Sequence, residues 1–518
     1  MSEAVFFQGS KLVRELYTVE RVIEKDQSKG KYVNPRLFLL NSKIDLYANK
    51  DVVLRGFYEW KQLHPLLQVN FVQVKVDNQT KHFMAQAPKE LVECSDNVHF
   101  TYYQSKNNNK AEMENCWKLL YENEFHNPID SQNSLLWRAL FVQLPKKNHL
   151  FRYGFIINLH HSITDGKNAY CVVQELFNII EDLHSAIISG SERIMRNENT
   201  IRATHELNYP NDTRAGKKAA DFEYSPTDEP SIVTLVPDYL KPDSSEETFE
   251  DEKLFDSGKF LTFDGKDFLT AKEVFDKRRA SVHRMCYLDV PHETFANFIR
   301  KSIELKIKLN ACFEMIALVS WRRIVRHFSA NSTLNPVVKY QVPVNLRPFL
   351  EPPLEESCMG VWISSFVPDV QVEYEETESE FWSKLFWDMA KKRSEAIHQY
   401  LNQKSFFAEA NLVQEQNIYY MLENGWKAKD VFIMYAVSNI GRMNGASNGS
   451  RRSIEIFEHH EGLAYTPECF ITAAYNGICT VDGKLCWAIT WNKQFLRQEI
   501  VHLWRDHMID IFTKLASS

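Results

Sequence analysis

Apolar positions in the first part of the chain alternate between helical and strand-like spacing. Residues 51–63 carry apolar side chains three and four positions apart, which predicts a helix that ends before Pro65. The runs 135–144 and 149–159 are almost continuously apolar, as in strands covered on both faces. Helical spacing then returns over 167–188, which predicts a long amphipathic helix directly after the second of these strands.

The same mixture of spacings returns in the last part of the chain. The pattern therefore predicts an α/β protein with two lobes of similar size, 1–190 and 281–518. Residues 191–280 contain several Pro residues and an acidic run, so we expect a crossover or insertion that is partly mobile, rather than a domain core. In the second lobe we expect strands at 282–288, 337–344, 431–437, 470–475 and 485–491 and helices at 292–305, 311–328 and 501–515.

Composition narrows the possible function classes. The chain has 518 residues, a formal net charge of −7 and only short basic clusters, such as 277–279, so we expect no nucleic acid partner. No apolar run reaches the roughly 18 residues of a membrane span, and the first residues lack the pattern of a signal peptide. The nine Cys residues show no metal-ligand spacing and are typical of reduced thiols. We therefore expect a cytoplasmic, monomeric protein without a metal ion.

The most informative motif is His160-His161-Ser-Ile-Thr-Asp165-Gly166, between a predicted strand and a predicted helix. A strand end that leads into a tight turn holds an imidazole rigidly. An ordinary imidazole pKa of about 6.5 leaves that ring largely neutral and able to accept a proton near neutral pH. Asp165 can turn back to an Arg and lock the loop, and Gly166 leaves room for a close backbone approach. The motif therefore favours general-base chemistry.

Several alternative interpretations are less favoured. A single His at a strand end is more often structural, but the double His with Asp and Gly in register argues against that explanation. A metal site is disfavoured because adjacent strand residues point to opposite faces and no third ligand is evident. A second pair, His459-His460, lacks a matching Asp, so we expect it at the surface. Residues 445–449 match G-x-S-x-G, but a strand-like stretch follows, so we expect a hairpin loop rather than a hydrolase nucleophile.

The motif around His161 resembles the signature of the chloramphenicol acetyltransferase-like superfamily. That group includes nonribosomal condensation domains, alcohol O-acetyltransferases and the plant BAHD acyltransferases. The resemblance extends along most of the chain, although Val437-Ser-Asn-Ile-Gly441 replaces the BAHD segment DFGWG and Val361 replaces the usual Asn after Gly360. A plant-type BAHD enzyme is therefore disfavoured. The alcohol O-acetyltransferase or condensation branch fits better, with the alcohol O-acetyltransferase branch the most similar. Other matching segments are His64–Phe71, Pro343–Pro348 with Met359-Gly360, Ser438–Gly441 and Thr472–Trp491.

This resemblance implies a specific architecture and site. Two lobes, each a mixed β-sheet flanked by helices, would meet in a V with a central tunnel, and His161 would be the general base at its middle. Asp165 would form a structural ion pair with Arg347 from the other lobe. Ser438 or Asn439 would contact the oxyanion or the substrate. Further support for the site would come from His160, Gly166 and Asn345.

The resemblance also implies the reaction. An acyl group, which we expect to be acetyl, would pass from an acyl-CoA thioester to a small-molecule alcohol, or to an amine, within a ternary complex. Acyl-CoA would be a co-substrate, and no cofactor would be bound permanently. One alternative is a free-standing condensation-type enzyme that takes a carrier-tethered acyl donor and forms an amide or ester. Another is a non-catalytic relative that uses the space between the lobes for binding.

Overall fold

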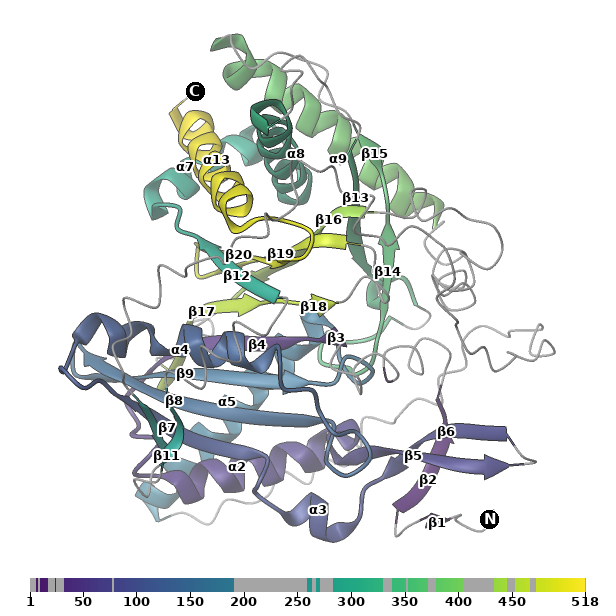
Figure 1. Cartoon of the computed structure of the whole chain (residues 1–518), viewed down its shortest axis with the longest axis vertical. Coiled ribbons are helices and arrows are strands. Elements are labelled where there is room, and N and C mark those ends of the chain that lie inside the picture. The colour runs from purple at the N-terminus through teal and green to yellow at the C-terminus, as the bar shows by residue number, and fades with distance from the viewer. Residues whose placement is uncertain are drawn as a thin grey trace.

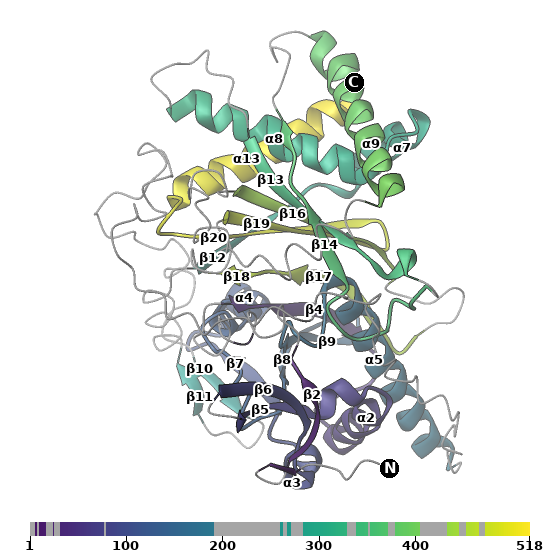
Figure 2. The same ribbon diagram turned by 90° about the vertical axis from the view of Figure 1, so that its right-hand side faces the viewer.

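The computed structural model describes residues 6–7, 10–16, 24, 32–76, 79–190, 259–262, 267–270, 283–328, 338–350, 353–370, 379–404, 433–444, 452–465 and 472–517. Two large sheets are stacked one above the other, each with helices against it (Figure 1). The view turned by 90° shows strands β17 (Ile454–Glu461) and β18 (Ala464–Tyr465) between the two lobes (Figure 2). This is the mixed α/β, two-lobed fold that the sequence predicts.

The first sheet has seven strands in the order β11-β10-β7-β8-β9-β4-β17. Alternate residues of its central strands enter different hydrophobic clusters, one against helices α2 and α5 and one against α4. Because both faces are covered, β8 and β9 read as almost continuous apolar runs. The bounds are β4 Pro35–Ser42, β7 Val98–Gln104, β8 Trp137–Lys147, β9 Leu150–Leu159, β10 Lys259–Thr262, β11 Asp267–Thr270, α2 Lys50–Leu63, α4 Lys110–Glu124 and α5 Gly166–Ser189.

Helices α2 and α5 confirm the two helices predicted in this lobe. The apolar side of α2 faces the sheet, where Phe57 stacks on Trp137 of β8 with 5.6 Å between ring centroids. Helix α2 also contacts α5, because the Trp60 indole N–H donates to the carbonyl of Val172 at 2.7 Å. These contacts fix α5, and therefore the turn that precedes it, against the sheet. A small sheet and a short helix extend the lobe: β1 Phe6–Phe7, β2 Ser10–Glu15, β5 Val69–Val76, β6 Gln79–Gln86 and α3 Lys89–Glu93.

The second sheet has the order β12-β20-β19-β16-β13-β14, with β15 paired to β13. Helices α7, α8, α9 and α13 lie on its outer side (Figure 1), and the Trp504 indole N–H ties α13 to α8 by donating to Ser320 Oγ at 2.8 Å. The bounds are β12 His283–Leu288, β13 Val338–Asn345, β14 Ile363–Phe366, β15 Asp369–Val370, β16 Ile433–Met443, β19 Thr472–Val481, β20 Lys484–Asn492, α7 His292–Glu304, α8 Leu309–Phe328, α9 Phe386–Gln403 and α13 Gln498–Ser517.

Two parts of the chain depart from the predicted division into lobes. Strand β17 comes from the segment assigned to the second lobe but pairs antiparallel with β4 of the first sheet, and β18 pairs with β3 (Tyr32–Val33). Strands β10 and β11 come from the predicted insertion, yet β10 extends the first sheet beside β7. In each case an edge strand offers free backbone groups that a distant segment can satisfy. The predicted mobility of 191–280 and the loop at 445–449 otherwise lie outside the described residues.

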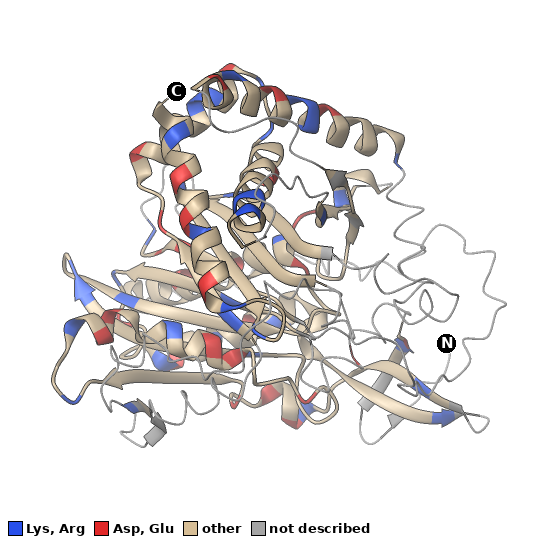
Figure 3. Ribbon diagram, turned by 45° about the horizontal axis from the view of Figure 1, so that its top comes forward, with Lys and Arg blue, Asp and Glu red and all other residues tan. Residues whose placement is uncertain are grey.

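Residues of both charges are mixed along the outer helices, whereas the central strands consist mostly of uncharged residues (Figure 3). Helices α9 and α13, for example, each carry acidic and basic residues. None of the helices in the described part of the chain combines the length and apolar character that a membrane crossing requires.

Candidate active site

The turn after β9 carries the His160-His161 pair. His160 is fully buried: its Nδ1 lies 2.7 Å from Ser162 Oγ, and its Nε2 lies 3.1 Å from a carboxylate oxygen of Glu24. The ring also meets Phe71 edge-on, with 5.2 Å between centroids. These contacts direct His160 into its own lobe, where it anchors the turn that presents His161.

Asp165 connects this turn to helix α5. Its Oδ1 accepts a hydrogen bond from the backbone N–H of Asn168 at 3.1 Å, which caps the helix N-terminus. Its Oδ2 accepts from Nη1 of Arg347 at 2.7 Å and from the backbone N–H of Trp362 at 3.2 Å. Asp165 and Arg347 are both almost completely buried. The predicted ion pair is therefore present, and it joins two segments 182 residues apart in sequence.

Arg347 holds a second loop against the histidine turn. Its Nη2 donates to the carbonyl of Cys358 at 2.8 Å, and Asn345 Oδ1 accepts from the backbone N–H of Arg347 at 3.2 Å. The backbone N–H of Gly360 donates to the carbonyl of Ile163 at 2.9 Å. Gly360 has a φ of 128°, a conformation that favours glycine. Arg347 thus contacts the turn through Asp165, and Asn345 contacts Arg347.

His161 is 5% exposed. Burial is the main cause that lowers the pKa of its imidazole to about 4, and the positive charge of Arg36 lowers it further, while Asp165 acts in the opposite direction. The imidazole is therefore unprotonated at neutral pH. An unprotonated ring at the end of a rigid strand can accept a proton from a bound group.

Sequence reasoning missed a buried pair of charges beside this turn. Arg36 on β4 and Glu461 on β17 are direct partners in the antiparallel register, so their side chains share one face of the sheet. The only sequence signal is a charged residue inside the apolar run 35–40 and another directly after His459-His460. Burial lowers the pKa of Arg36 and raises that of Glu461.

Glu461 also connects the two sheets. Its Oε1 accepts the hydroxyl protons of Ser438 on β16, at 3.1 Å, and of Tyr475 on β19, at 2.8 Å. Its Oε2 lies over the first residue of α5, because a Cβ added to Gly166 would come within 2.9 Å of it. A Cβ at Gly166 would also meet Ile440 at 2.7 Å. Gly166 therefore makes room for side chains of the C-terminal half, not for backbone as we expected.

The two residues predicted to contact the oxyanion both use their donors within the protein. Ser438 donates its hydroxyl proton to Glu461. Asn439 Nδ2 donates to Oδ1 of Asn310, and Asn439 Oδ1 accepts from the backbone N–H of Gly441 at 2.9 Å. Either side chain would have to release its partner before it could donate to a reacting oxygen.

The expectation that His459-His460 lies at the surface is wrong. Both rings are buried, with 0% and 4% exposure, because β17 is sandwiched between the lobes. His459 stacks on Phe38 at 4.3 Å between centroids, and its Nδ1 lies 2.9 Å from the carbonyl of Leu37. His460 lies on the other face of the strand, with its Nε2 2.6 Å from a carboxylate oxygen of Glu458.

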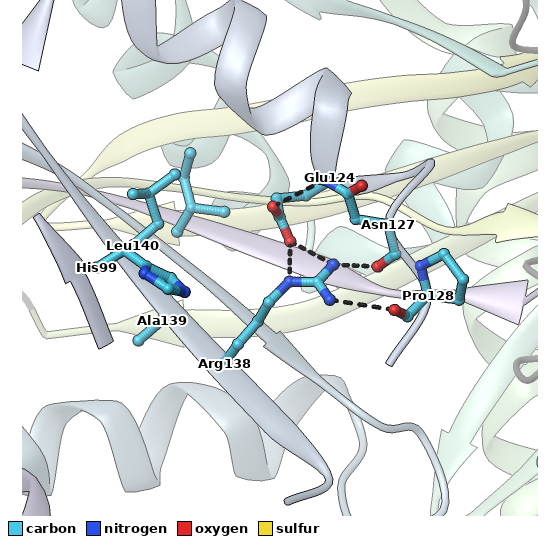
Figure 4. Close-up of a pocket in the computed structure, with 8 residues that line it drawn as sticks. His99, Glu124, Asn127, Pro128, Arg138, Ala139 and Leu140 are labelled. Carbon is cyan, nitrogen blue, oxygen red and sulfur yellow. Dashed lines mark hydrogen bonds and ion pairs between the residues drawn. The ribbon is translucent and has the colours of Figure 1, made fainter. Parts of the chain in front are cut away.

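A separate pocket of about 270 Å³ lies where α4 meets β7 and β8 (Figure 4). Arg138 points into it, but its Nε donates to Glu124 at 2.7 Å and its Nη1 donates to the carbonyl of Pro128 at 3.2 Å. Its guanidinium is thus engaged within the protein. Nowhere in the described ranges do three or more His, Cys, Asp or Glu side chains gather in a way that could hold a metal ion.

Comparison with known proteins identifies the fold. No protein-family model matches the chain, and no curated protein matches its sequence. Among solved structures, trichothecene 15-O-acetyltransferase from Fusarium sporotrichioides is similar, with a TM-score of 0.61, 10% identity and coverage of 99% of this chain and 97% of the other. The chain has the chloramphenicol acetyltransferase-like fold.

A condensation domain and an epimerization domain are similar to the chain as well. The first condensation domain of the calcium-dependent antibiotic synthetase gives a TM-score of 0.57 at 11% identity, over 98% of this chain and 97% of the other. The epimerization domain of tyrocidine synthetase B gives 0.55 at 12% identity, over 99% and 98%. The similarity in fold thus covers 98–99% of the chain in these three matches, while identities this low do not specify an activity.

Proposed function

We propose that the protein is an acyltransferase in which His161 is the general base. The observation that carries this proposal is the construction of the His161 turn: a buried, unprotonated imidazole at a strand end, locked by the Asp165–Arg347 ion pair at 2.7 Å. The similarity to an O-acetyltransferase and to condensation domains supports it at the level of the fold. Acyl-CoA is the proposed donor and a small-molecule alcohol the proposed acceptor, with an amine as a variant of the same chemistry.

The proposed reaction is a direct transfer within a ternary complex. As the acceptor oxygen attacks the thioester carbonyl, its proton moves to His161, and a tetrahedral oxyanion forms. When the intermediate collapses, the C–S bond breaks and the thiolate takes the proton from the imidazolium. Because thiol pKa values lie at about 8.5, the thiolate is a good leaving group. A positioned base of this kind contributes about 10²–10⁴-fold to the rate.

The surroundings of His161 suit both of its protonation states. Burial keeps the imidazole neutral before the reaction, and the nearby Asp165 carboxylate favours the imidazolium that forms during it. Asp165 itself is held by the Asn168 N–H and by Arg347, so it serves to orient the turn rather than to take up the proton. No covalent acyl-enzyme is required.

A second candidate is a condensation-type enzyme with an acyl donor tethered to a carrier protein. The observation that favours it is the similarity of the chain to a condensation domain over 98% of its length. In that case the same base would act, but the donor would arrive on a protein partner and the product would be an amide or ester.

Thiol release from a panel of acyl-CoAs, each supplied with alcohols or amines, tests the proposal. We expect saturable, acceptor-dependent release of CoA thiol together with an acylated product found by mass spectrometry. Donors presented on phosphopantetheinyl carrier proteins form the parallel arm, and turnover in that arm alone would favour the condensation-type enzyme. Absence of transfer in both arms, with the folded protein, would contradict the proposal.

A further inference from the structure

Two cysteines lie opposite each other near the tip of the hairpin formed by β19 and β20. The two strands are joined by the turn Asp482-Gly483, in which both residues have a positive φ, of 47° and 84°. This is the backbone of a tight two-residue hairpin turn, and its length fixes the register of the strands. In that register Cys479 and Cys486 are direct partners. Cys286, the third described cysteine on a strand, has no cysteine opposite it.

The geometry of this cysteine pair suits a disulfide. Direct partners in an antiparallel pair of strands have Cα atoms about 4.5–5.5 Å apart and side chains on the same face of the sheet. A disulfide spans Cα separations of about 4.4–6.8 Å, so the pair can be bridged with little backbone movement. Both side chains are 2% exposed and face the core of the first lobe, whereas Leu485 and Trp487 point to the opposite side. Cys479 Sγ also donates to the carbonyl of His459 on β17 at 3.5 Å.

The two thiols are hydrogen-bonded to each other, which makes them chemically unequal. This hydrogen bond stabilises a Cys486 thiolate and is the main cause that lowers its pKa to about 7; burial acts against it, and His460 acts with it. Burial and the neighbouring Cys486 raise the pKa of Cys479. A thiolate beside a second thiol is the arrangement in which a reversible disulfide forms, because the thiolate attacks an oxidant and the second thiol resolves the product.

We propose that Cys479 and Cys486 form a redox-active dithiol site, which hydrogen peroxide converts to a disulfide and a thiol reductant restores. Hydrogen peroxide is small and uncharged, which suits two side chains that are almost completely buried. The Cys486 thiolate attacks the O–O bond and becomes a sulfenic acid, and the released hydroxide takes up a proton to give water. Cys479 then displaces the sulfenic oxygen as a second water, and the S–S bond forms. The two thiols lose two electrons and two protons, and the peroxide is reduced to water. This site is separate from His161 and does not depend on the proposed acyl transfer.

The test exposes the folded full-length protein to hydrogen peroxide, then alkylates the remaining thiols in denaturant and maps tryptic peptides by mass spectrometry without reduction. Cleavage after Lys484 separates the two cysteines into peptides 453–484 and 485–493. We expect these peptides to be joined, with the loss of two hydrogen atoms, and to separate after treatment with dithiothreitol. Cys286 and Cys312 are the internal references. They are also buried, and burial raises the pKa of each to about 12, so both should remain free for alkylation.

Two variants assign the crosslink, because peptide 453–484 also contains Cys469. Cys479→Ser should abolish the joined peptides and leave Cys486 as a sulfenic acid that dimedone traps. Cys486→Ser should abolish them as well and leave Cys479 reduced. Peptides that stay separate in the peroxide-treated wild-type protein, or that are still joined in folded Cys479→Ser, would overturn the inference. Because the wild-type measurement and the fragmentation of the joined peptides need no variant, the test holds even where a variant does not fold.

Discussion

The two double-histidine segments of this chain look alike in sequence but occupy different structural settings. His160-His161 stands in the turn between β9 and α5, where Asp165 caps the helix and binds Arg347. His459-His460 lies inside strand β17, so its two rings point to opposite faces of the sheet. One ring stacks on Phe38, and the other meets Tyr287 at 4.7 Å between centroids.

Burial alone therefore does not distinguish a candidate base from a structural histidine. The pKa of His161 is lowered to about 4 and that of His459 to about 3, in both cases mainly by burial. The two histidines differ in the contacts that hold their segments in place. His161 belongs to a turn that is fixed from both halves of the chain, whereas His459 is held by stacking and by one backbone carbonyl. Substitutions in the two segments should therefore differ in their effects on the free energy of unfolding and on acyl transfer.

The largest effect on stability is expected at the ion pair that supports the first segment. Arg347→Ala or Asp165→Asn should lower the free energy of unfolding by about 3–5 kcal/mol, because one buried charge loses its partner. Acyl transfer should fall as well, since the turn is released. Urea unfolding measures the first effect. The matched control is Glu93→Gln in the exposed Lys89–Glu93 pair, for which a loss of about 1 kcal/mol or less is expected. Equal losses in both pairs would refute the structural role of Asp165.

A smaller effect is expected in the second segment. His459→Leu removes the contact between Nδ1 and the Leu37 carbonyl, and the loss of one buried hydrogen bond costs about 0.5–1.5 kcal/mol. Thermal and urea unfolding would detect this loss. A His459 variant with wild-type stability would show that the ring is not a structural part of β17.

The pH dependence of stability should reflect both buried rings. The native pKa values of His161 and His459 lie below the ordinary value of about 6.5, so the unfolded chain binds more protons as the pH falls through that value. Each ring thus lowers the free energy of unfolding on acidification, by about 1.4 kcal/mol per pH unit below 6.5 and down to its native pKa. His459→Leu should reduce this slope relative to the wild type in urea unfolding at a series of pH values. An unchanged slope would mean that His459 titrates normally.

The sequence predicted the parts of the fold that depend on local patterns. Helices α2 and α5 and strand β9 follow from the spacing of apolar residues, and the Asp165–Arg347 pair follows from the resemblance of two motifs. Strand β16 was predicted too short, because Ser438, Asn439 and Gly441 resemble a strand end, while a register shift after Asn439 lets the strand continue.

Features that depend on distant pairing could not be predicted from the sequence. Strand β17 pairs with β4 of the first sheet, which joins residues more than 400 positions apart in sequence. Nothing in the local pattern of 454–461 specifies β4 as the partner. For the same reason Glu461 and Arg36 did not appear as a pair, although each is an unusual charge beside apolar residues. The burial of His459-His460 follows from the same pairing of β17 with β4.

The most direct test of the central claim compares His161→Ala with His149→Ala, which changes an exposed imidazole on the same lobe. The measurement is the kcat of acyl transfer from the acyl-CoA donor, with circular dichroism and urea unfolding to show that both variants are folded. If His161 is the base, its removal should lower kcat by about 10²–10⁴-fold with little change in folding, while His149→Ala keeps the wild-type value. A folded His161→Ala protein that retains more than about a tenth of the wild-type kcat would contradict the assignment of His161 as the general base.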